Sequence, residues 1–273
     1  MMLEKGTLHP DSTVQFYFPD YPESVYKETS NKITLNQLVN HSSGIRQTEE
    51  NEHIWRGYNI TLEKSLDNFK NDPLDFMPGW YQSPSPYNYS LLGAVMEKVS
   101  GTNFQELLRT YITDTLQLTN TEVDNPFKTI IGRTDFYDLN LVAQIVNATF
   151  RDMRYRGSSE GILSNAEDLV KFGNAILYSD IIPEEIKERM FVPTQLLGED
   201  LSRIANGWII QKNKNDEFYY GKLGSVTGGG AILLIIPDLE FVLAATVNLT
   251  SDEEIPIFKL LQPFLSEKND DSK

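Results

Sequence analysis

The sequence predicts an α+β fold built from two unequal parts. Between residues 33 and 178 apolar residues recur at the spacing of amphipathic helices, most clearly over 89–100. After residue 203 the pattern changes to short apolar runs separated by polar turns, as in antiparallel strands. A last helical segment is expected at 255–265. Helices followed by antiparallel strands are typical of an α+β protein.

We expect one domain over residues 1–266, with a mostly helical lobe at 33–178 and an antiparallel sheet with a C-terminal helix at 203–266. Two smaller domains are the alternative at a length of 273 residues. The polar residues 267–273 are predicted to be disordered, because chain ends without apolar anchors fray.

The composition limits the classes of function. The formal net charge of −15 argues against a nucleic-acid partner or an anionic membrane, since both need clustered Lys and Arg. No apolar run approaches the ~20 residues of a transmembrane segment. The chain has no cysteine, and its three histidines, at 9, 41 and 53, have no paired spacing. We therefore expect no disulfide, no thiol nucleophile, no metal site and no cofactor.

Capping residues mark the predicted helices. Residues 33–40 are helical in pattern, with Thr34 as the N-cap and Gly44 beyond the end. The apolar stripe of residues 89–100 is closed by Gly101. Further helices are expected at 62–69, at 104–116 and at 165–177, while residues 11–32 are expected to be an irregular connection and residues 1–5 to end a helix at Gly6, without a signal or transit peptide.

Two hairpins are predicted after residue 203. Residues 208–211 and 217–221 flank a polar turn, and residues 231–236 and 241–248 flank Pro-Asp. The helix expected at 255–265 then closes the domain.

Four passages keep the order and spacing of one family's motifs. They are residues 34–45 (Thr-Leu-Asn-Gln-Leu-Val-Asn-His-Ser-Ser-Gly-Ile), 69–101 (with Pro-Gly at 78–79 and Leu-Leu-Gly at 91–93), 161–178 (beginning Gly-Ile-Leu-Ser) and 222–225 (Lys-Leu-Gly-Ser). Together they resemble the penicillin-binding-protein and serine beta-lactamase-like family over nearly the whole chain. The resemblance implies a beta-lactamase/transpeptidase-like fold, with a helical lobe, an antiparallel sheet flanked by helices, and a site in the cleft between them. It also implies serine-dependent acyl transfer on a peptide or small acyl substrate.

Within this resemblance, Lys222 occupies the family's Lys/His-Thr-Gly position. A cation there is expected to face the substrate carboxylate and to assist proton transfer. Gly224 is expected to let the acyl group lie along the strand, and the Ser225 N–H to donate to the oxyanion. A lone Lys-x-Gly is more often a surface lysine at a strand end, but the glycines at 228–230 and the apolar run after them favour the site. We assign Lys222 and Ser225 to catalysis and Gly224 to substrate binding.

The family's catalytic tyrosine is not at its usual place. Its position falls on Pro84, and proline carries no proton to transfer. Tyr81 and Tyr87, each three residues away, are the open alternatives, and we include Tyr87 among the substrate-binding residues.

A second departure lies before the 161–178 passage. Ser159 and Glu160 replace the first two residues of a Gly-Gly-Gly turn and add bulk and charge beside the cleft. We expect both to line the substrate site, with Glu160 paired to Lys222. His41 is interpreted as an imidazole that supports the site from a helix end.

The family's nucleophile motif, Ser-x-x-Lys on a helix, and the strands before it would be expected upstream of residue 1. Residues 24–27 (Ser-Val-Tyr-Lys) match the pattern, but they follow prolines at 19 and 22 in the expected irregular segment. The motif works because i and i+3 share a helix face, so we interpret this match as accidental.

Two hypotheses follow from these observations. One is a serine hydrolase represented by an incomplete chain, inactive as given. The other is a pseudoenzyme kept as a scaffold, for which the resemblance to mitochondrial family members implies a homo-oligomer or filament. The same resemblance implies a mitochondrial location, with cytoplasmic or secreted locations as alternatives.

Overall fold

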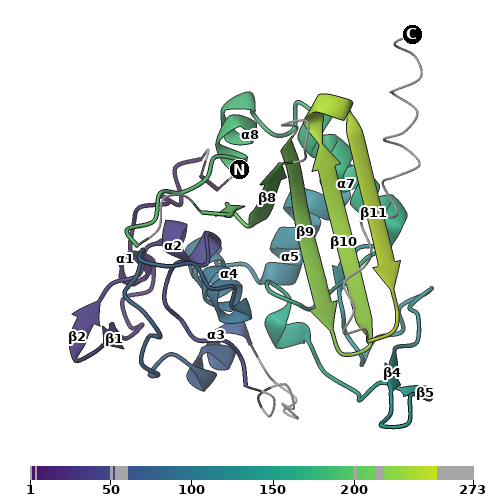
Figure 1. Cartoon of the computed structure of the whole chain (residues 1–273), viewed down its shortest axis with the longest axis horizontal. Coiled ribbons are helices and arrows are strands. Elements are labelled where there is room, and N and C mark those ends of the chain that lie inside the picture. Colours follow the sequence, from purple (N-terminus) through teal and green to yellow (C-terminus); the bar gives the residue numbers. More distant parts are fainter. Residues whose placement is uncertain are drawn as a thin grey trace.

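The computed structural model describes residues 2–3, 5–49, 52, 61–198, 202–212 and 218–250. A smaller helical lobe and a larger part built on a five-stranded sheet lie side by side (Figure 1). The predicted α+β fold is confirmed. The helix expected at 255–265 and the tail at 267–273 lie outside the described residues, and the boundaries of the single domain stay a prediction.

One helix, α4 (Pro86–Ser100), organises the helical lobe. Three helices pack against it: α1 (Val14–Tyr17), α2 (Leu35–Val39) and α3 (Leu62–Ser65), the last extended by a 3₁₀ turn over Leu66–Asn68. Leu38, Leu91 and Val95 are fully buried in the core that these elements share. Burial of this apolar surface holds the short helices together, because isolated helices of this length are unstable in water.

The predicted capping residues mark the start of α2 and the end of α4. Thr34 Oγ1 accepts from the Gln37 N–H at 3.2 Å, and Gln37 Oε1 accepts from the Thr34 N–H at 2.9 Å, which completes a capping box. Gly101 ends α4 with φ 67°, a left-handed conformation that glycine adopts without strain. α4 begins at Pro86 rather than at residue 89, because proline suits the first helical position.

The expectation of an irregular segment at 11–32 was wrong in part. The segment contains α1 and a hairpin of β1 (Ser24–Tyr26) with β2 (Thr29–Asn31), whose turn has Lys27 and Glu28 at positive φ. Such turns usually carry Asn-Gly, and Lys-Glu does not have this hairpin signature. At the N-terminus, Gly6 donates to Leu3 and Thr7 to Met2 in the pattern of a Schellman cap, as expected for a helix end at Gly6.

The helix predicted at 104–116 is continuous but widened. α5 (Phe104–Leu108) passes through a π-turn, Arg109–Thr113, into α6 (Asp114–Leu116). The predicted helix at 165–177 is α7 (Ala166–Tyr178), which Asn165 caps. Further elements that were not predicted are α8 (Glu184–Met190), β3 (Glu122–Val123), its partner β6 (Ile162–Leu163), the hairpin of β4 (Tyr137–Leu139) with β5 (Ile145–Asn147), and the short strand β7 (Ile204–Ala205).

The sheet has the order β11-β10-β9-β8-β7, and all its described pairs are antiparallel. Its strands are β7 (Ile204–Ala205), β8 (Trp208–Lys212), β9 (Phe218–Val226), β10 (Gly229–Ile236) and β11 (Phe241–Val247). Both predicted hairpins are confirmed, with strands longer than expected, so that residues 222–225 lie within β9. In this register Lys222 pairs with Leu233.

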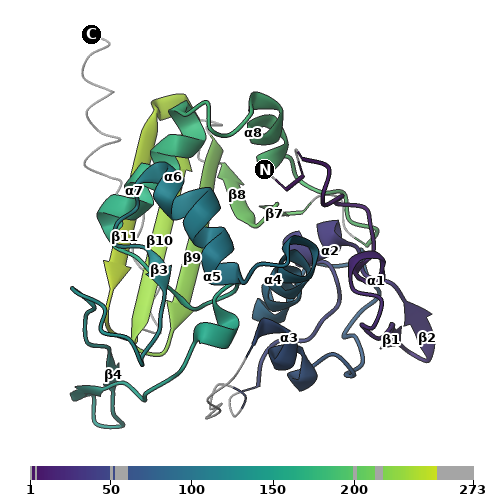
Figure 2. The same cartoon turned by 180° about the vertical axis from the view of Figure 1, so that it is seen from behind.

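Helices cover one face of this sheet. α7 contacts β10 and β11, and Figure 2 shows α5, α6 and α7 in front of the strands. Leu233 and Ile235 of β10 face this layer, whereas Leu234 and Ile236 belong to a cluster on the opposite face. In the part of the chain that the structure describes, no helix combines the length and apolar character needed to cross a membrane.

Candidate active site

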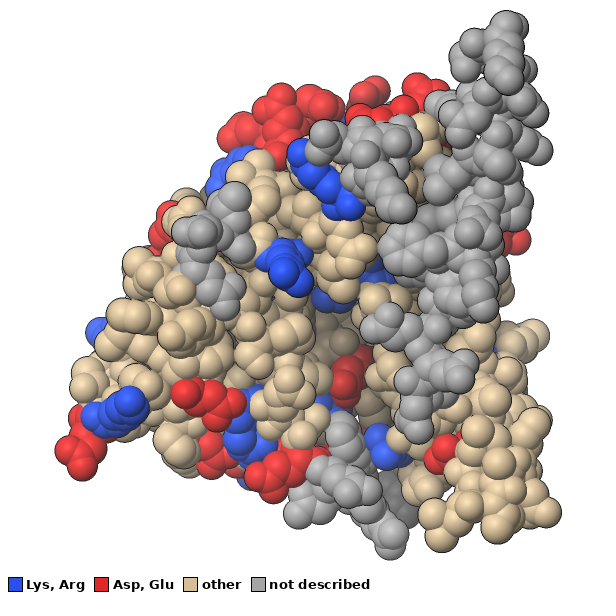
Figure 3. Space-filling model, viewed as in Figure 1, with Lys and Arg blue, Asp and Glu red and all other residues tan. Residues whose placement is uncertain are grey.

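Lys222 lies where the sheet meets the helical lobe. Its Nζ donates to the carbonyl of Gly207, in the turn between β7 and β8, at 3.0 Å. The same Nζ lies 5.2 Å from the centroid of the Tyr89 ring on α4, a cation–π distance. Although the side chain as a whole is exposed, its ammonium end is enclosed enough that desolvation lowers the pKa of Lys222. Figure 3 shows the molecular surface hollowed between these two parts.

His41 lies beneath the same contact. The imidazole is buried, its ring meets Tyr89 edge-on with centroids 5.0 Å apart, and its Nδ1 accepts from the Ser85 N–H at 3.3 Å. Burial, and secondarily the charge of Lys222, lowers the pKa of His41 to about 4. The imidazole is therefore neutral at pH 7, and its contacts suit the supporting role inferred from the sequence.

Tyr89 was missed by the sequence reasoning. Its hydroxyl donates to the Val39 carbonyl at 3.0 Å, and burial raises the pKa of the phenol. A Cβ at Gly207 would lie 2.3 Å from this hydroxyl, and Gly207 has φ +89°, so both space and backbone demand glycine there.

Tyr87 packs within the helical lobe. Its ring stacks on Phe69 with centroids 4.1 Å apart, and the guanidinium groups of Arg46 and Arg156 lie 5.4 and 5.6 Å from its centroid. Burial, and then the carboxylate of Glu52, raises the pKa of Tyr87. Residues two apart on a helix point in different directions, so when Tyr89 meets Lys222, Tyr87 points elsewhere.

The other residues near the departures take separate positions. Tyr81 is exposed and contacts Phe76 edge-on, with centroids 5.9 Å apart. Ser85 directly precedes α4 but makes no side-chain cap bond; its Oγ donates instead to the Arg46 carbonyl at 2.6 Å. Pro84 stands between Ser85 and Ser83, whose N–H donates to the His41 carbonyl at 2.9 Å.

The expected ion pair between Glu160 and Lys222 was wrong. Glu160 pairs instead with Arg156, one helical turn before it, at 3.1 Å. The 3₁₀ turn Arg154–Arg156 brings that guanidinium to the carboxylate, because residues four apart in a helical turn are neighbours. Glu160 is therefore paired within its own segment. Burial raises the pKa of Glu160, and the charges of Arg156 and Arg151 oppose this shift. Ser159 lies against α4, with its Oγ 3.2 Å from the Ser90 Oγ.

Gly224 and Ser225 lie on β9 next to Lys222 and pair with Ala231 and Gly230. Among the residues that the structure describes, no atom lies within 4 Å of where a Cβ at Gly224 would stand. The structure thus places Lys222, Gly224 and Ser225 on one strand and brings the Lys222 ammonium to Tyr89 and near His41.

Residues 24–27 do not form a Ser-x-x-Lys helix. Ser24 lies in β1, where it is buried and pairs with Asn31, and Lys27 lies in the turn after that strand. The two side chains do not share a helix face, so the interpretation of this match as accidental is confirmed.

Hydrogen bonds join the two parts beside the site. Asn40 Oδ1 accepts from the Asn206 N–H at 2.7 Å, while Gln82 Nε2 donates to the Asn40 carbonyl at 2.7 Å and to Ser202 Oγ at 2.6 Å. Asn40 is fully buried, so these bonds form away from water, where an unmade bond is costly.

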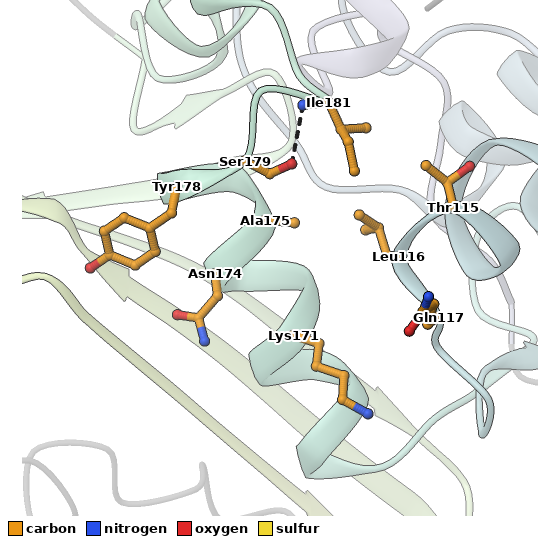
Figure 4. A pocket seen from close by; sticks show the side chains of 9 residues that line it. All are labelled: Thr115, Leu116, Gln117, Lys171, Asn174, Ala175, Tyr178, Ser179 and Ile181. Carbon is orange, nitrogen blue, oxygen red and sulfur yellow. Dashed lines mark hydrogen bonds between the residues drawn. The ribbon is translucent and has the colours of Figure 1, made fainter.

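No group of three or more His, Asp or Glu side chains that could hold a metal ion occurs among the described residues. An open groove of about 430 Å³ lies between α6 and α7, where Leu116, Ala175 and Ile181 give it an apolar floor (Figure 4). Neither Lys222 nor its neighbours line that groove.

The fold and the strand-borne lysine beside a helical lobe define a protein of the beta-lactamase/transpeptidase-like class. The chain belongs to the beta-lactamase family, since the sequence model described as Beta-lactamase matches residues 1–259. A related protein is the human serine beta-lactamase-like protein LACTB, mitochondrial, 25% identical over 86% of this chain. The chain spans 59% of that relative's length.

Solved structures share the fold. The D-amino acid amidase from Ochrobactrum anthropi SV3, complexed with L-phenylalanine amide, superposes with a TM-score of 0.80, at 19% identity, over 98% of this chain and 79% of that one. An octameric penicillin-binding protein homologue from Pyrococcus abyssi gives a TM-score of 0.78, at 22% identity, over 96% and 62%. At these identities the likeness concerns the fold.

Proposed function

We propose that β9 and α4 form the substrate-binding wall of a serine-type acyl-transfer site, which acts on a peptide or small acyl substrate. Lys222 would face the substrate carboxylate and move protons, the Ser225 N–H would donate to the oxyanion, and Gly224 would let the acyl group approach the strand. The observation that carries this proposal is the position of Lys222 between the sheet and the helical lobe, beside Tyr89. Ser159 and Glu160 complete the proposed set of substrate-binding residues, and Tyr87, which is buried against Phe69, would support them from within the helical lobe.

We further propose that the 273-residue chain, as given, does not itself catalyse serine acyl transfer. Residues 24–27 form no helical Ser-x-x-Lys, and Pro84 stands at the tyrosine position. Acid–base assistance is typically worth about 10²–10⁴-fold. Each oxyanion donor is worth roughly 10²–10³-fold, and without a nucleophile there is no covalent route. These losses together leave no appreciable catalysis.

A non-catalytic scaffold is the second candidate. The engagement of Lys222 with Gly207 and of Glu160 with Arg156 favours it, because charges that serve internal contacts stabilise the fold without substrate. Kinship with mitochondrial LACTB supports a mitochondrial location, with cytoplasmic or secreted as alternatives. The octameric homologue supports a homo-oligomer or filament as partner arrangement, and the net charge of −15 supports the absence of a nucleic-acid partner.

Covalent labelling tests the proposal that the chain is inactive. Purified chain is incubated with a fluorescent fluorophosphonate and with a fluorescent penicillin, and intact-mass spectrometry measures the adduct. We expect no adduct. Stoichiometric labelling that Ser24→Ala abolishes would make Ser24 the nucleophile, and labelling that survives this substitution would reveal another; either result overturns the proposal.

A further inference from the structure

The hairpin of β4 and β5 exposes apolar side chains at a projecting end of the molecule. Leu141 at its tip is 107% exposed and Val142 is 72% exposed. Figures 1 and 2 show the hairpin extending beyond the end of the sheet, away from the helical lobe. Other large apolar residues exposed on or beside it are Phe127, Ile131, Leu139, Ile145, Val146 and Phe150. Exposed apolar surface on this scale marks a site of interaction.

From Leu139 through the tip to Phe150 this surface is free of charge, in a strongly acidic chain and next to Asp138 of β4. Residues 139–150 (Leu-Asn-Leu-Val-Ala-Gln-Ile-Val-Asn-Ala-Thr-Phe) contain no Asp, Glu, Lys or Arg, although the whole chain carries −15. Three cations near the base of the hairpin are paired: Lys128 with Glu122 at 2.8 Å, Arg133 with Asp124 at 2.9 Å and Arg154 with Asp152 at 2.6 Å. The region therefore offers apolar contact rather than electrostatic attraction.

Several polar groups of the tip are bonded within the hairpin. Asn140 Oδ1 accepts from the N–H groups of Val142 and Gln144 at 3.0 and 2.9 Å. Asn140 Nδ2 donates to Gln144 Oε1 at 3.1 Å, and the Asn140 and Ala143 N–H groups are also bonded within the turn. Each of these internal bonds lowers the cost of moving the turn out of water.

The base of the hairpin is fixed to the sheet. The Tyr137 N–H donates to the Asn248 carbonyl at 3.0 Å, and the Tyr137 carbonyl accepts from the Thr250 N–H at 2.9 Å. Both partners lie just beyond β11. Binding through the tip therefore needs no reorganisation of the hairpin, which keeps the entropic cost of association low.

We propose that the β4–β5 tip inserts Leu141 and Val142 into the surface of a neutral lipid bilayer. The tip is convex, uncharged and internally hydrogen-bonded, so it matches a bilayer surface, which presents no fixed shape for it to complement. A bilayer of zwitterionic lipid is preferred to an anionic one, because the net charge of the chain is repelled by acidic headgroups. Insertion of two aliphatic side chains into the outer few ångströms gives peripheral, reversible binding.

The test is co-sedimentation of the chain with vesicles of pure phosphatidylcholine. We expect binding that survives a rise in salt and that added phosphatidylglycerol does not strengthen. The double variant Leu141→Asn/Val142→Asn should bind at least roughly tenfold more weakly, since the loss of even one buried aliphatic side chain weakens binding by about that factor. The control Phe16→Asn/Val192→Asn removes exposed apolar residues elsewhere, leaves the charge unchanged, and should bind as the parent chain does.

A second readout does not depend on comparing affinities. Tryptophan at position 142, introduced as Val142→Trp, should shift its emission to shorter wavelength on phosphatidylcholine vesicles and be quenched by brominated acyl chains. The proposal is overturned by the absence of binding to phosphatidylcholine or by equal binding of the tip variant. It is also overturned by binding that requires anionic lipid. Sedimentation velocity without vesicles provides the last check: self-association that the tip variant abolishes would make a second copy the occupant, for example through the groove of Leu116 and Ile181.

Discussion

The ammonium of Lys222 lies 5.2 Å from the centre of the Tyr89 ring and so connects the sheet to the helical lobe. Lys222 reaches this place from β9, while Tyr89 is held from α4 by its bond to Val39. The contact fixes the distance between the two sides of the candidate site. That distance limits the size of a substrate that can bind between them.

Replacing Lys222 tests the strength of this connection. Lys222→Met keeps most of the aliphatic stem but removes the cation–π contact and the bond to Gly207. The substitution also removes the cost of taking the ammonium out of water, which offsets part of the loss. The net decrease in the free energy of unfolding, measured by urea denaturation, should be about 1–2 kcal/mol. Lys32→Met, at an exposed lysine that pairs with the exposed Glu23, is the control and should leave the midpoint unchanged. An unaltered midpoint for Lys222→Met would show that the contact is not formed in solution.

The low pKa of His41 predicts a pH-dependent stability. The folded-state pKa of about 4 lies below the ordinary value of 6.5, so between these values the unfolded chain binds a proton that the folded chain excludes. The contribution is therefore complete above pH 6.5 and is lost as the pH falls to about 4, by up to about 3 kcal/mol.

The check for His41 is urea unfolding at several pH values. His41→Asn, which tolerates the positive φ of 55°, should be less stable than the parent chain at pH 7 but should lack this part of the decline. His9→Asn is the matched control and should decline as the parent does. Parallel pH profiles for the parent and His41→Asn would contradict the assignment.

Gly207→Ala should be more destabilising than an ordinary glycine replacement in a turn. The φ of +89° strains any side chain by about 1–3 kcal/mol, and the new methyl group would overlap the Tyr89 hydroxyl. Gly132→Ala separates these effects, because Gly132 has φ +80° with no atom within 4 Å of its Cβ. Adding Tyr89→Phe should recover part of the excess. Equal thermal unfolding of the two alanine variants would show that the overlap is relieved without cost.

Asn40→Ala should weaken the contact between the helical lobe and the part built on the sheet. The substitution leaves the Asn206 N–H without its acceptor, at a cost of roughly 1–3 kcal/mol. Asn36→Ala is a suitable control, because it removes a bond to Asn40 within the helical lobe and keeps the Asn206 bond. We expect faster amide exchange at β7 and β8 in Asn40→Ala alone; similar exchange in both variants would place the effect in the helix.

The sequence-based predictions of local structure were correct where capping residues or apolar runs mark an element. Thr34 and Gly101 fix helix ends through hydrogen bonds and backbone freedom within a few residues. The hairpins around β8–β9 and β10–β11 follow from apolar runs and turns. α8 was missed because it has no buried residue, and so no clear apolar stripe to read.

By itself the sequence determined the family, the order of the main helices and strands, and the placement of Lys222, Gly224 and Ser225 on one strand, since motif spacing and local periodicity carry this information. Only the tertiary structure decided that Tyr89 rather than Tyr87 meets Lys222, and that Asn40 accepts from Asn206. The first outcome depends on how α4 is rotated about its axis against the sheet, and the second on how the helical lobe meets the turn between β7 and β8. Packing between distant segments sets both, and periodicity along one chain does not encode it.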